Sequence, residues 1–400
     1  MGEKKLIPKL RFSGDETYIK TKLEDIANVT GGKRMPKGSL LIDEPNNHPY
    51  ITVSNMNNNF EDLNEYQYVP EDIYPKIKNY IVDYNDLIIS VAGTLGLVKK
   101  VPKCLDKANL TENANKISKI KIDIDYLKYY LCTSIIQNRI SAVQTNNAQP
   151  KLALKEIRSF KINYPSLNEQ KKVSKFLTLV DNKIEWLEKK HQNYLNFKKY
   201  LMQQIFAQKL RFDFNDEWKK YLLGDISLIG KGFTPSTGNP SFWDGELKWL
   251  SIADMNQGKY INHTTKKITS EGSKNKEPIL KGTLIMSFKL SIGKLGILTE
   301  DMYTNEAICN FKWKNKDVLT EYMYYYLSSI NILKYGSQAA KGITLNNETL
   351  STIPVLLPSV EEQKKIINIL SDVDVKINML ENSIYDTLKF KKGLLQQMFV

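Results

Sequence analysis

The residues whose spacing most suggests catalysis are Asp244, Glu246 and Lys248, which stand in the segment DGELK. A glutamate two positions before a lysine is a spacing found in metal-dependent nucleases, in which carboxylates hold the cation and the lysine stabilises the reacting phosphate. Those nucleases carry their metal-binding aspartate on a separate strand many residues earlier, whereas Asp244 stands almost beside Glu246. A free-standing nuclease is therefore only an alternative interpretation.

Other sequence motifs of catalysis are absent from the chain. It has no GxxxxGK[ST] loop, no GxG opening of a dinucleotide-binding helix, no GxSxG turn and no [ND]PP[YF] tetrapeptide of amino-methyltransferases. The three histidines, His48, His191 and His263, are far apart and belong to no metal-binding pattern. These absences favour a protein that binds over one that catalyses, with no metal and no cofactor of its own.

The composition is that of a globular protein with a mild positive charge. Hydrophobic residues make up 42% of the 400 residues, and the formal net charge is +13. This charge is spread along the chain, which suits phosphate contacts from folded surfaces without requiring them. The sequence has no run of 18 apolar residues, no signal-like core and no paired cysteines. We therefore expect a cytoplasmic protein that does not enter a membrane.

One long segment occurs twice in the chain. PSLNEQKK begins at Pro165 and PSVEEQKK begins at Pro358, and 21 of the 42 positions that follow from each proline are identical. Both copies start with the S-x-x-E spacing of a helix capping box. Few helix breakers follow, so each copy predicts a helix of roughly 60 Å.

Apolar residues recur in each copy at the alternating spacings of three and four that are typical of a coiled-coil seam. The two copies most simply pair within one chain, although pairing between two chains remains open. Lys198 and Lys391 interrupt the two seams at matching positions, either to set the register or as snorkelling lysines near a helix end. The predicted seam residues are Val173, Leu177, Val180, Ile184, Leu187, Ile366, Leu370, Val373, Ile377 and Leu380.

The duplication extends into the segments that precede the helices. KLRF occurs at 9–12 and 209–212, PYITVSNMN corresponds to KWLSIADMN, and NDLIISVAGTLG corresponds to GTLIMSFKLSIG. Short β-type runs alternate there with tyrosine-rich helical patterns, which predicts α+β domains. We expect two pseudo-symmetric globular domains, at 1–164 and 209–357, that alternate with the long helices at 165–208 and 358–400.

This organisation resembles the DNA-specificity subunit of type I restriction–modification systems over essentially all of the chain. The resemblance rests on the two PSxxEQKK helix starts, the QQ[IM]F helix ends and the WKKYLLGDI opening. GFTPSTGNPSFWDGELKWLSIADMN is typical of the start of a target-recognition domain, and NDLIISVAGTLG and LTENANKI also fit. The first domain departs from the second because NNHPY replaces the FWDGELKW stretch.

The resemblance implies a non-catalytic subunit with two target-recognition domains separated by an antiparallel coiled coil. Each domain would read one half of a split sequence in double-stranded DNA, and the helix pair would fix their separation. Two methyltransferase subunits would bind the helices, and motor–nuclease subunits would join through them. S-adenosylmethionine, ATP and Mg²⁺ would belong to those partners. A protein-interaction scaffold, or a decoy specificity subunit without such partners, remains the alternative.

Polar loops in both domains supply candidate DNA contacts. Lysine and arginine suit phosphates and guanine edges, and amide side chains can pair with adenine in the major groove. An ordinary polar turn is the alternative for each loop. The candidates in the first domain are Lys33, Arg34, Lys37, Asn146, Asn147, Gln149 and Lys151, and those in the second are Lys231, Thr234, Ser236, Thr237, Asn239, Gln338 and Lys341.

Overall fold

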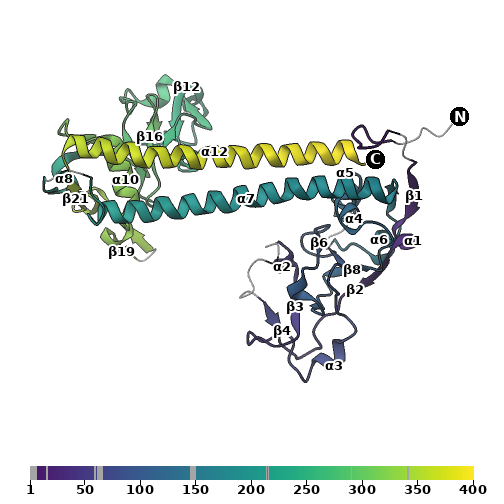
Figure 1. Cartoon of the computed structure of the whole chain (residues 1–400). Coiled ribbons are helices and arrows are strands. Elements are labelled where there is room, and N and C mark those ends of the chain that lie inside the picture. The colour runs from purple at the N-terminus through teal and green to yellow at the C-terminus, as the bar shows by residue number, and fades with distance from the viewer. Residues whose placement is uncertain are drawn as a thin grey trace. The chain divides into compact units, whose positions relative to one another are not determined.

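The chain forms two compact units in the computed structural model, which describes residues 7–14, 17–57, 60, 66–144, 150–212, 214, 216–289, 291–339 and 342–400. The first unit comprises Met1–Glu188 and Asn382–Val400, and the second comprises Lys189–Glu381. Each unit therefore combines a globular domain with a part of both long helices (Figure 1). The four-part division expected from the sequence remains a prediction.

The globular domain of the first unit contains a four-stranded antiparallel sheet in the order β2-β8-β5-β6. In a second sheet, β4-β3-β7, β3 runs parallel to β7, and β1 pairs with β9. The strands are β1 (Ile19–Lys22), β2 (Asn28–Gly31), β3 (Pro49–Ile51), β4 (Gln67–Tyr68), β5 (Leu87–Ser90), β6 (Val98–Lys100), β7 (Asn109–Leu110), β8 (Ala114–Ser118) and β9 (Lys161–Tyr164). The short helices are α1 (Leu23–Ile26), α2 (Val53–Asn57), α3 (Tyr74–Ile77), α4 (Ile124–Leu131), α5 (Ser134–Gln144) and α6 (Leu154–Arg158).

The second unit repeats this plan with the sheets β11-β18-β15-β16-β13 and β14-β12-β17 and the pairs β10-β21 and β19-β20. Its strands are β10 (Lys219–Leu222), β11 (Ser227–Lys231), β12 (Trp243–Leu250), β13 (Tyr260–Ile261), β14 (Lys266–Ile268), β15 (Leu284–Ser287), β16 (Leu295–Leu298), β17 (Tyr303–Thr304), β18 (Ile308–Trp313), β19 (Ser337–Ala339), β20 (Gly342–Thr344) and β21 (Pro354–Leu357). Its short helices are α8 (Leu223–Ile226), α9 (Ser270–Ser273), α10 (Thr320–Ser329) and α11 (Asn347–Ser351).

The strand registers show that the two domains are copies of one fold. Ile117 of β8 pairs with β2 on one side and with β5 on the other, and Phe311 of β18 has the same place between β11 and β15. The central strands β5 and β15 read LIIS and LIMS and are buried along their whole length. Such continuous apolar strands require cover on both faces of the sheet.

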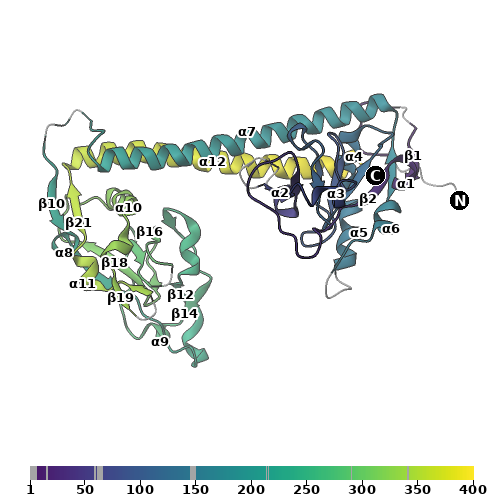
Figure 2. The ribbon, with the colours of Figure 1, turned by 90° about the horizontal axis from the view of Figure 1, so that it is seen from below.

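The two long helices, α7 (Leu167–Phe206) and α12 (Val360–Met398), lie side by side and run antiparallel (Figures 1 and 2). The beginning of α7 packs with the end of α12 in the first unit, and the end of α7 packs with the beginning of α12 in the second. Each seam continues directly into the core of a globular domain. The ten predicted seam residues are all buried: Val173, Leu177, Val180, Ile184, Leu187, Ile366, Leu370, Val373, Ile377 and Leu380.

The glutamine of each EQKK motif attaches a long helix to its globular domain. Gln170 Oε1 accepts a hydrogen bond from the backbone N–H of Asp123 at 2.8 Å, just before α4. Gln363 Oε1 accepts the equivalent bond from the backbone N–H of Leu319 at 3.0 Å, just before α10. Both glutamines are almost fully buried. The repeated motif therefore fixes the start of each long helix against the same point of each domain.

The buried glutamate of the same motif has different partners in the two copies. The Glu362 carboxylate binds Arg211 through two contacts, at 2.9 and 3.2 Å, and accepts the indole N–H of Trp218 at 3.0 Å. Glu169 Oε1 instead accepts the backbone N–H of Phe12 at 2.6 Å. Within the described part of the chain, Glu169 Oε2 has no hydrogen-bond partner. The repeated sequence therefore produces a charged pair at Glu362 that the described residues of the other copy do not form at Glu169.

The KLRF segments occupy equivalent places at the ends of the two long helices. In the second copy the backbone N–H of Leu210 donates to the Gln204 carbonyl at 3.1 Å, within the turn that follows α7. In the first, Leu10 N–H donates to the carbonyl of Gln397 in α12 at 2.9 Å, although the two residues are far apart in sequence. The first KLRF segment thus packs against the helix end as the second does, without being continuous with it.

The tyrosine-rich helices α4 and α10 are part of the cores of the two domains. Tyr322, Tyr325 and Tyr326 of α10 are buried, and Tyr324 is partly buried against the same cluster. Burial raises the pKa of Tyr324 to about 12. These side chains therefore pack the domain and do not offer rings for base stacking.

Candidate nucleic-acid interface

The first candidate loop begins where β2 ends and is fixed closely to the turn between β7 and β8. The backbone N–H of Lys33 donates to the Leu110 carbonyl at 2.8 Å, and the hydroxyl of Tyr50 donates to the Lys33 carbonyl at 2.8 Å. A Cβ atom on Gly32 would lie 2.0 Å from the Thr111 carbonyl oxygen. Only glycine allows this close approach of two backbones. The loop therefore leaves the sheet in one fixed direction.

The second domain fixes its loop in the same way with different side chains. The backbone N–H of Phe233 donates to the Thr304 carbonyl at 2.8 Å, and the indole N–H of Trp249 donates to the Phe233 carbonyl at 2.9 Å. A Cβ atom on Gly232 would lie 2.1 Å from the Thr304 carbonyl oxygen. Trp249 thus replaces Tyr50 as the donor. We call this arrangement the loop platform: the backbone at Gly32 and Lys33, or at Gly232 and Phe233, is held by hydrogen bonds to neighbouring strands. The loop platform has the same backbone contacts in the two domains.

In both loops, a glutamate carboxylate accepts a hydrogen bond from the side chain of the next candidate residue. Arg34 Nε lies 2.6 Å from Glu112 Oε1, and the Thr234 hydroxyl donates to the Glu306 carboxylate. Burial opposes the charge of Glu112, but hydrogen bonds from Arg34 and neighbouring groups outweigh it and lower its pKa below the ordinary value. The same contact raises the pKa of Arg34.

Sequence reasoning did not select these two glutamates as site residues. The signal that could have found them is their position in LTENANKI and YTNEAICN, where the two repeats align around Glu112 and Glu306. A guanidinium with a carboxylate and a hydroxyl with a carboxylate offer different combinations of hydrogen-bond donors and acceptors. The two platforms therefore carry unlike chemistry at the same point of the fold.

The predicted lysines of these loops reach solvent. The ammonium of Lys33 lies 5.5 Å from the centre of the Tyr80 ring, and Lys37 and Lys231 are exposed. The flat ring positions the first of these charges, because a cation is attracted to an aromatic face. Exposed cations beside a rigid backbone suit contacts with phosphate oxygens.

The remaining candidates of the second loop have mixed surroundings. Ser236 and Thr237 are exposed, and the Ser236 carbonyl accepts the indole N–H of Trp243 at 3.2 Å. Asn239 Oδ1 accepts the backbone N–H of Ser241 at 3.1 Å and so caps the short helix Pro240–Phe242. The Asn239 side chain therefore shapes the loop.

The remaining candidates lie in the segments around Lys151 in the first domain and Gln338 in the second. Lys151 is exposed and precedes α6, which lies beside β2 (Figure 2). The Leu154 side chain of α6 lies 4.0 Å from the position that a Cβ atom on Gly31 would take. In the second domain, Asn347 of α11 donates to the Ile229 carbonyl of β11 at 3.0 Å. The structure thus places α6, which follows Lys151, beside the strand β2 that leads into the first loop. Asn146, Asn147, Gln149 and Lys341 lie outside the described residues, and for Gln338 only the backbone is described.

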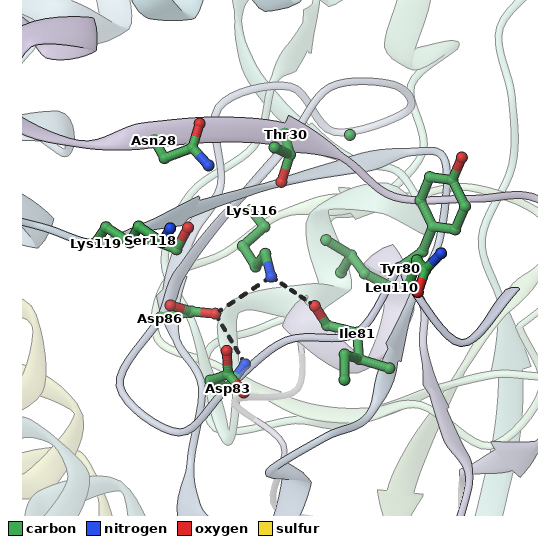
Figure 3. Close-up of a pocket in the computed structure, with 12 residues that line it drawn as sticks. Asn28, Thr30, Tyr80, Ile81, Asp83, Asp86, Leu110, Lys116, Ser118 and Lys119 are labelled. Carbon is green, nitrogen blue, oxygen red and sulfur yellow. Dashed lines mark hydrogen bonds and ion pairs between the residues drawn. The ribbon is translucent and has the colours of Figure 1, made fainter.

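A pocket of about 490 Å³ lies beside the first loop, between β2, β8 and the segment 79–86 (Figure 3). The Lys116 ammonium projects into it, donates to the Ile81 carbonyl at 2.8 Å and lies 3.9 Å from Asp86. Burial raises the pKa of Asp86, and the carboxylate accepts the backbone N–H of Asp83 at 2.8 Å. The inner charges are paired with each other and with the backbone. Lys116 therefore holds the segment 79–86 against β8.

The possible nuclease residues lie along β12. Lys248 binds Glu300 at 2.5 Å and the Asn262 carbonyl at 2.9 Å, whereas Asp244 and Glu246 are exposed. Over the described ranges, no three His, Cys, Asp or Glu side chains are gathered as ligands of one metal ion would be. The spacing in DGELK therefore finds no supporting cluster around it.

The close approach at Gly232 gives a direct test of the platform. Gly232→Ala should lower the free energy of unfolding by about 3 kcal/mol, because the added methyl group overlaps backbone atoms and displaces the loop. Gly238→Ala is the matched control, since its Cβ would meet no atom closer than 4.0 Å. It should change stability by less than about 0.5 kcal/mol. Equal losses in denaturant unfolding of the two variants would contradict this geometry.

Comparison with known proteins identifies the same duplicated organisation. Two segments of the chain, 15–196 and 215–389, each match the family described as Type I restriction modification DNA specificity domain. The chain is 26% identical to the MjaVIII specificity subunit of Methanocaldococcus jannaschii, over 95% of this chain and 91% of that relative. It is 30% identical to the MjaIX specificity subunit of the same organism over 42% of this chain, and that alignment spans only 39% of the relative's length.

Solved structures share the fold. The chain superimposes on the type I restriction–modification S subunit from M. genitalium with a TM-score of 0.59 at 14% identity, covering 99% of both chains. It also superimposes with a TM-score of 0.60 on a chain from a structure described as the basis of complex assembly and conformational transition of the type I system, covering 96% of this chain and 97% of that one. The predicted α+β fold with two domains and a pair of long helices is therefore confirmed. No helix among the described residues has the length and apolar character needed to cross a membrane.

Proposed function

Because the chain belongs to the type I restriction–modification DNA specificity family, we propose that it reads a split DNA sequence, with one half-site bound by each domain. Its relatives are named specificity subunits, and like them it is a non-catalytic component. The observation that carries the proposal is the duplicated loop platform: equivalent backbones, held at Gly32 and Gly232, present unlike side chains. Two such platforms suit two half-sites of different sequence.

The chemistry of each platform fits the edges of bases in the major groove. A free arginine can donate two hydrogen bonds to guanine, and a carboxylate can accept one from the amino group of cytosine. In the first domain Arg34 and Glu112 satisfy each other until a base edge replaces one partner. In the second, Thr234 and Glu306 form the corresponding pair. The exposed lysines Lys33 and Lys231 would hold the phosphates on either side.

We propose that partner subunits perform the chemistry. Two adenine methyltransferase subunits with S-adenosylmethionine would bind this chain, and motor–nuclease subunits that use ATP and Mg²⁺ would join through them. The long helices carry exposed apolar side chains at matching positions of the two copies: Leu195 with Leu388, and Phe197 with Phe390. Apolar side chains at the surface can contribute to a protein interface. Because the same positions are exposed in both copies, the two long helices offer equivalent surfaces to two copies of one partner.

The proposed setting is the cytoplasm, where the DNA and these partners meet. The three cysteines, Cys104, Cys132 and Cys309, are all free thiols. This state suits a reducing compartment. Burial raises the pKa of the Cys309 thiol to about 12, so its sulfur stays protonated inside the core.

Co-expression with an adenine methyltransferase subunit, followed by genome-wide mapping of methylated adenines, tests the proposal. We expect a split motif with a fixed gap and two different halves, and a complex that contains two methyltransferase subunits for each specificity chain. Methylation without a split motif would contradict the DNA-reading function. A chain that purifies with other proteins but shows no salt-dependent DNA binding would be a scaffold instead.

Arg34→Gln in the same assay tests the assignment of the first loop. We compare methylation at sites that are altered in one half of the motif with methylation at the full motif. This ratio should rise by about tenfold in the variant, because one bidentate base contact contributes about 1–3 kcal/mol of discrimination. Lys103→Gln removes the same charge from an exposed position outside the loop and should leave both halves of the motif unchanged. Relaxed reading of both halves in Arg34→Gln, or of neither, would contradict this assignment.

A further inference from the structure

The two lysines that interrupt the helix seams form ion pairs across the helix pair. Lys391 Nζ of α12 lies 2.6 Å from Asp181 Oδ1 of α7 in the first unit. Lys198 Nζ of α7 lies 2.5 Å from Asp374 Oδ1 of α12 in the second. All four side chains are between 21% and 28% exposed, so solvent reaches each pair only in part. The lysines therefore pair across the helices.

The second oxygen of each aspartate binds the neighbouring globular domain. The hydroxyl of Tyr129 in α4 donates to Asp181 Oδ2 at 2.8 Å, and that of Tyr325 in α10 donates to Asp374 Oδ2 at 2.6 Å. Each tyrosine hydroxyl also lies close to a hydroxyl one turn earlier on the long helix, that of Thr178 at 3.2 Å or of Ser371 at 3.1 Å. In each unit, a tyrosine, an aspartate and a lysine therefore form a junction between the globular domain and the two long helices. The two junctions have the same three residue types and the same contacts.

The junctions combine strong and directional contacts. Both tyrosines are almost fully buried, and burial is the main cause that raises their pKa, so each hydroxyl remains a donor to its aspartate. Hydrogen bonds to charged groups contribute about twice as much as neutral ones. An additional lysine approaches each junction: Lys128 lies 3.7 Å from Asp181, and Lys259 lies 3.2 Å from the Tyr325 hydroxyl.

One carboxylate in each unit thus connects three separate parts of the chain. The lysine contact fixes the register of α7 against α12, because a slip of one residue moves the helices by about 1.5 Å and breaks a contact of this length. The hydrogen bond from the tyrosine fixes the globular domain of that unit to the same aspartate of the helix pair. The two contacts share one aspartate, so they hold domain and register together.

We propose that these two Tyr–Asp–Lys junctions are positioning sites that set the gap between the half-sites which the protein accepts. Tyr129, Asp181 and Lys391 form the first junction, and Tyr325, Asp374 and Lys198 form the second. This inference rests on the proposed function. Each domain reads its own half-site, whereas the junctions decide at what distance and rotation along the helix pair that reading takes place. They are positioning residues and touch no DNA.

The test uses the co-expressed methyltransferase complex and DNA in which the two half-sites stand at the wild-type gap or one base pair closer or farther apart. The double variant Tyr129→Phe/Tyr325→Phe removes only the two hydroxyls. We expect methylation at the altered gaps, relative to the wild-type gap, to rise by about tenfold, since a hydrogen bond to a charged group contributes more than that factor in equilibrium. The variant Asp181→Asn/Asp374→Asn, which also removes the ion pairs, should relax the gap at least as far.

The double variant Tyr126→Phe/Tyr322→Phe is the matched control. These tyrosines are equally buried on the same two helices, but their hydroxyls donate to the carbonyls of Asn163 and Leu356 inside their own domains. The control should lose stability without relaxing the gap. An unchanged gap ratio in the Tyr129→Phe/Tyr325→Phe variant, with a lower melting temperature only, overturns the junction proposal. Failure of the wild-type complex to methylate any split site would instead overturn the proposed function.

Discussion

Replacement of Arg211 by alanine is expected to lower the free energy of unfolding by about 3 kcal/mol. The Glu362 side chain is only 1% exposed, and Arg211 is the cation that binds it through two contacts. Removal of the arginine leaves a buried carboxylate that, among the described residues, keeps the hydrogen bond from the Trp218 indole N–H at 3.0 Å. A buried charge without its counter-charge is among the most destabilising changes in a protein. Denaturant unfolding of the full chain measures the loss.

Arg11→Ala provides the matched control for this prediction, because Arg11 has the same place in the first KLRF segment. Arg11 donates to the Pro8 carbonyl at 3.0 Å, and Glu169 takes the backbone N–H of Phe12 instead. We therefore expect Arg11→Ala to cost less than about 1 kcal/mol. Equal losses in the two variants would show that the charged pair at Glu362 adds no stability beyond what Arg11 contributes in the first copy.

Insertion of seven residues into α7 alone, after Glu188, is expected to abolish directed methylation. On α7 the residues Asp181 and Lys198 are as far apart in sequence as Asp374 and Lys391 are on α12. Both cross-helix ion pairs can form together only while these two separations match. An insertion in one helix makes them unequal, so one pair and the seam around it must come apart. Methylation mapping and thermal unfolding would both record the failure.

Matched insertions in both helices, after Glu188 and after Glu381, should restore a paired seam. Seven residues add about 10 Å to each helix, which corresponds to about three base pairs of duplex at 3.4 Å per step. We expect the complex with both insertions to methylate a split motif whose gap has lengthened by up to about three base pairs, with unchanged half-site sequences. A gap that stays the same would refute the role of the helix pair in setting the spacing.

The repeated architecture could be predicted from the sequence because its signals are local and occur twice. The spacing of apolar residues along a helix depends on the geometry of that helix alone, and all ten seam residues, from Val173 to Leu380, are indeed buried. The PSxxEQKK segments showed where each long helix starts, and α7 and α12 begin at Leu167 and Val360. The family followed from the same motifs and is confirmed by the match over both halves of the chain.

The candidate interface was only partly accessible to the same reasoning. Polar loops indicated Lys33, Arg34 and Lys231, which are cations at the surface of the described platforms. Their partners lie elsewhere in the sequence: Glu112 meets Arg34 only because β2 pairs with β8. Strand pairing of this kind is a non-local event that no single segment encodes. The base-contacting roles of the loop residues remain predictions.

The sequence by itself determined that this protein has two copies of one domain, each followed by a long amphipathic helix, because duplication and heptad spacing can be read along the chain. The tertiary structure decided which polar groups meet. It gave Glu362 an arginine and left one oxygen of Glu169 without a partner in the described chain, and it brought Lys391 to Asp181 and Tyr129. Side-chain pairs of this kind depend on distances of a few ångströms between segments that are far apart in sequence. Identical motifs can therefore acquire different partners once the chain has folded.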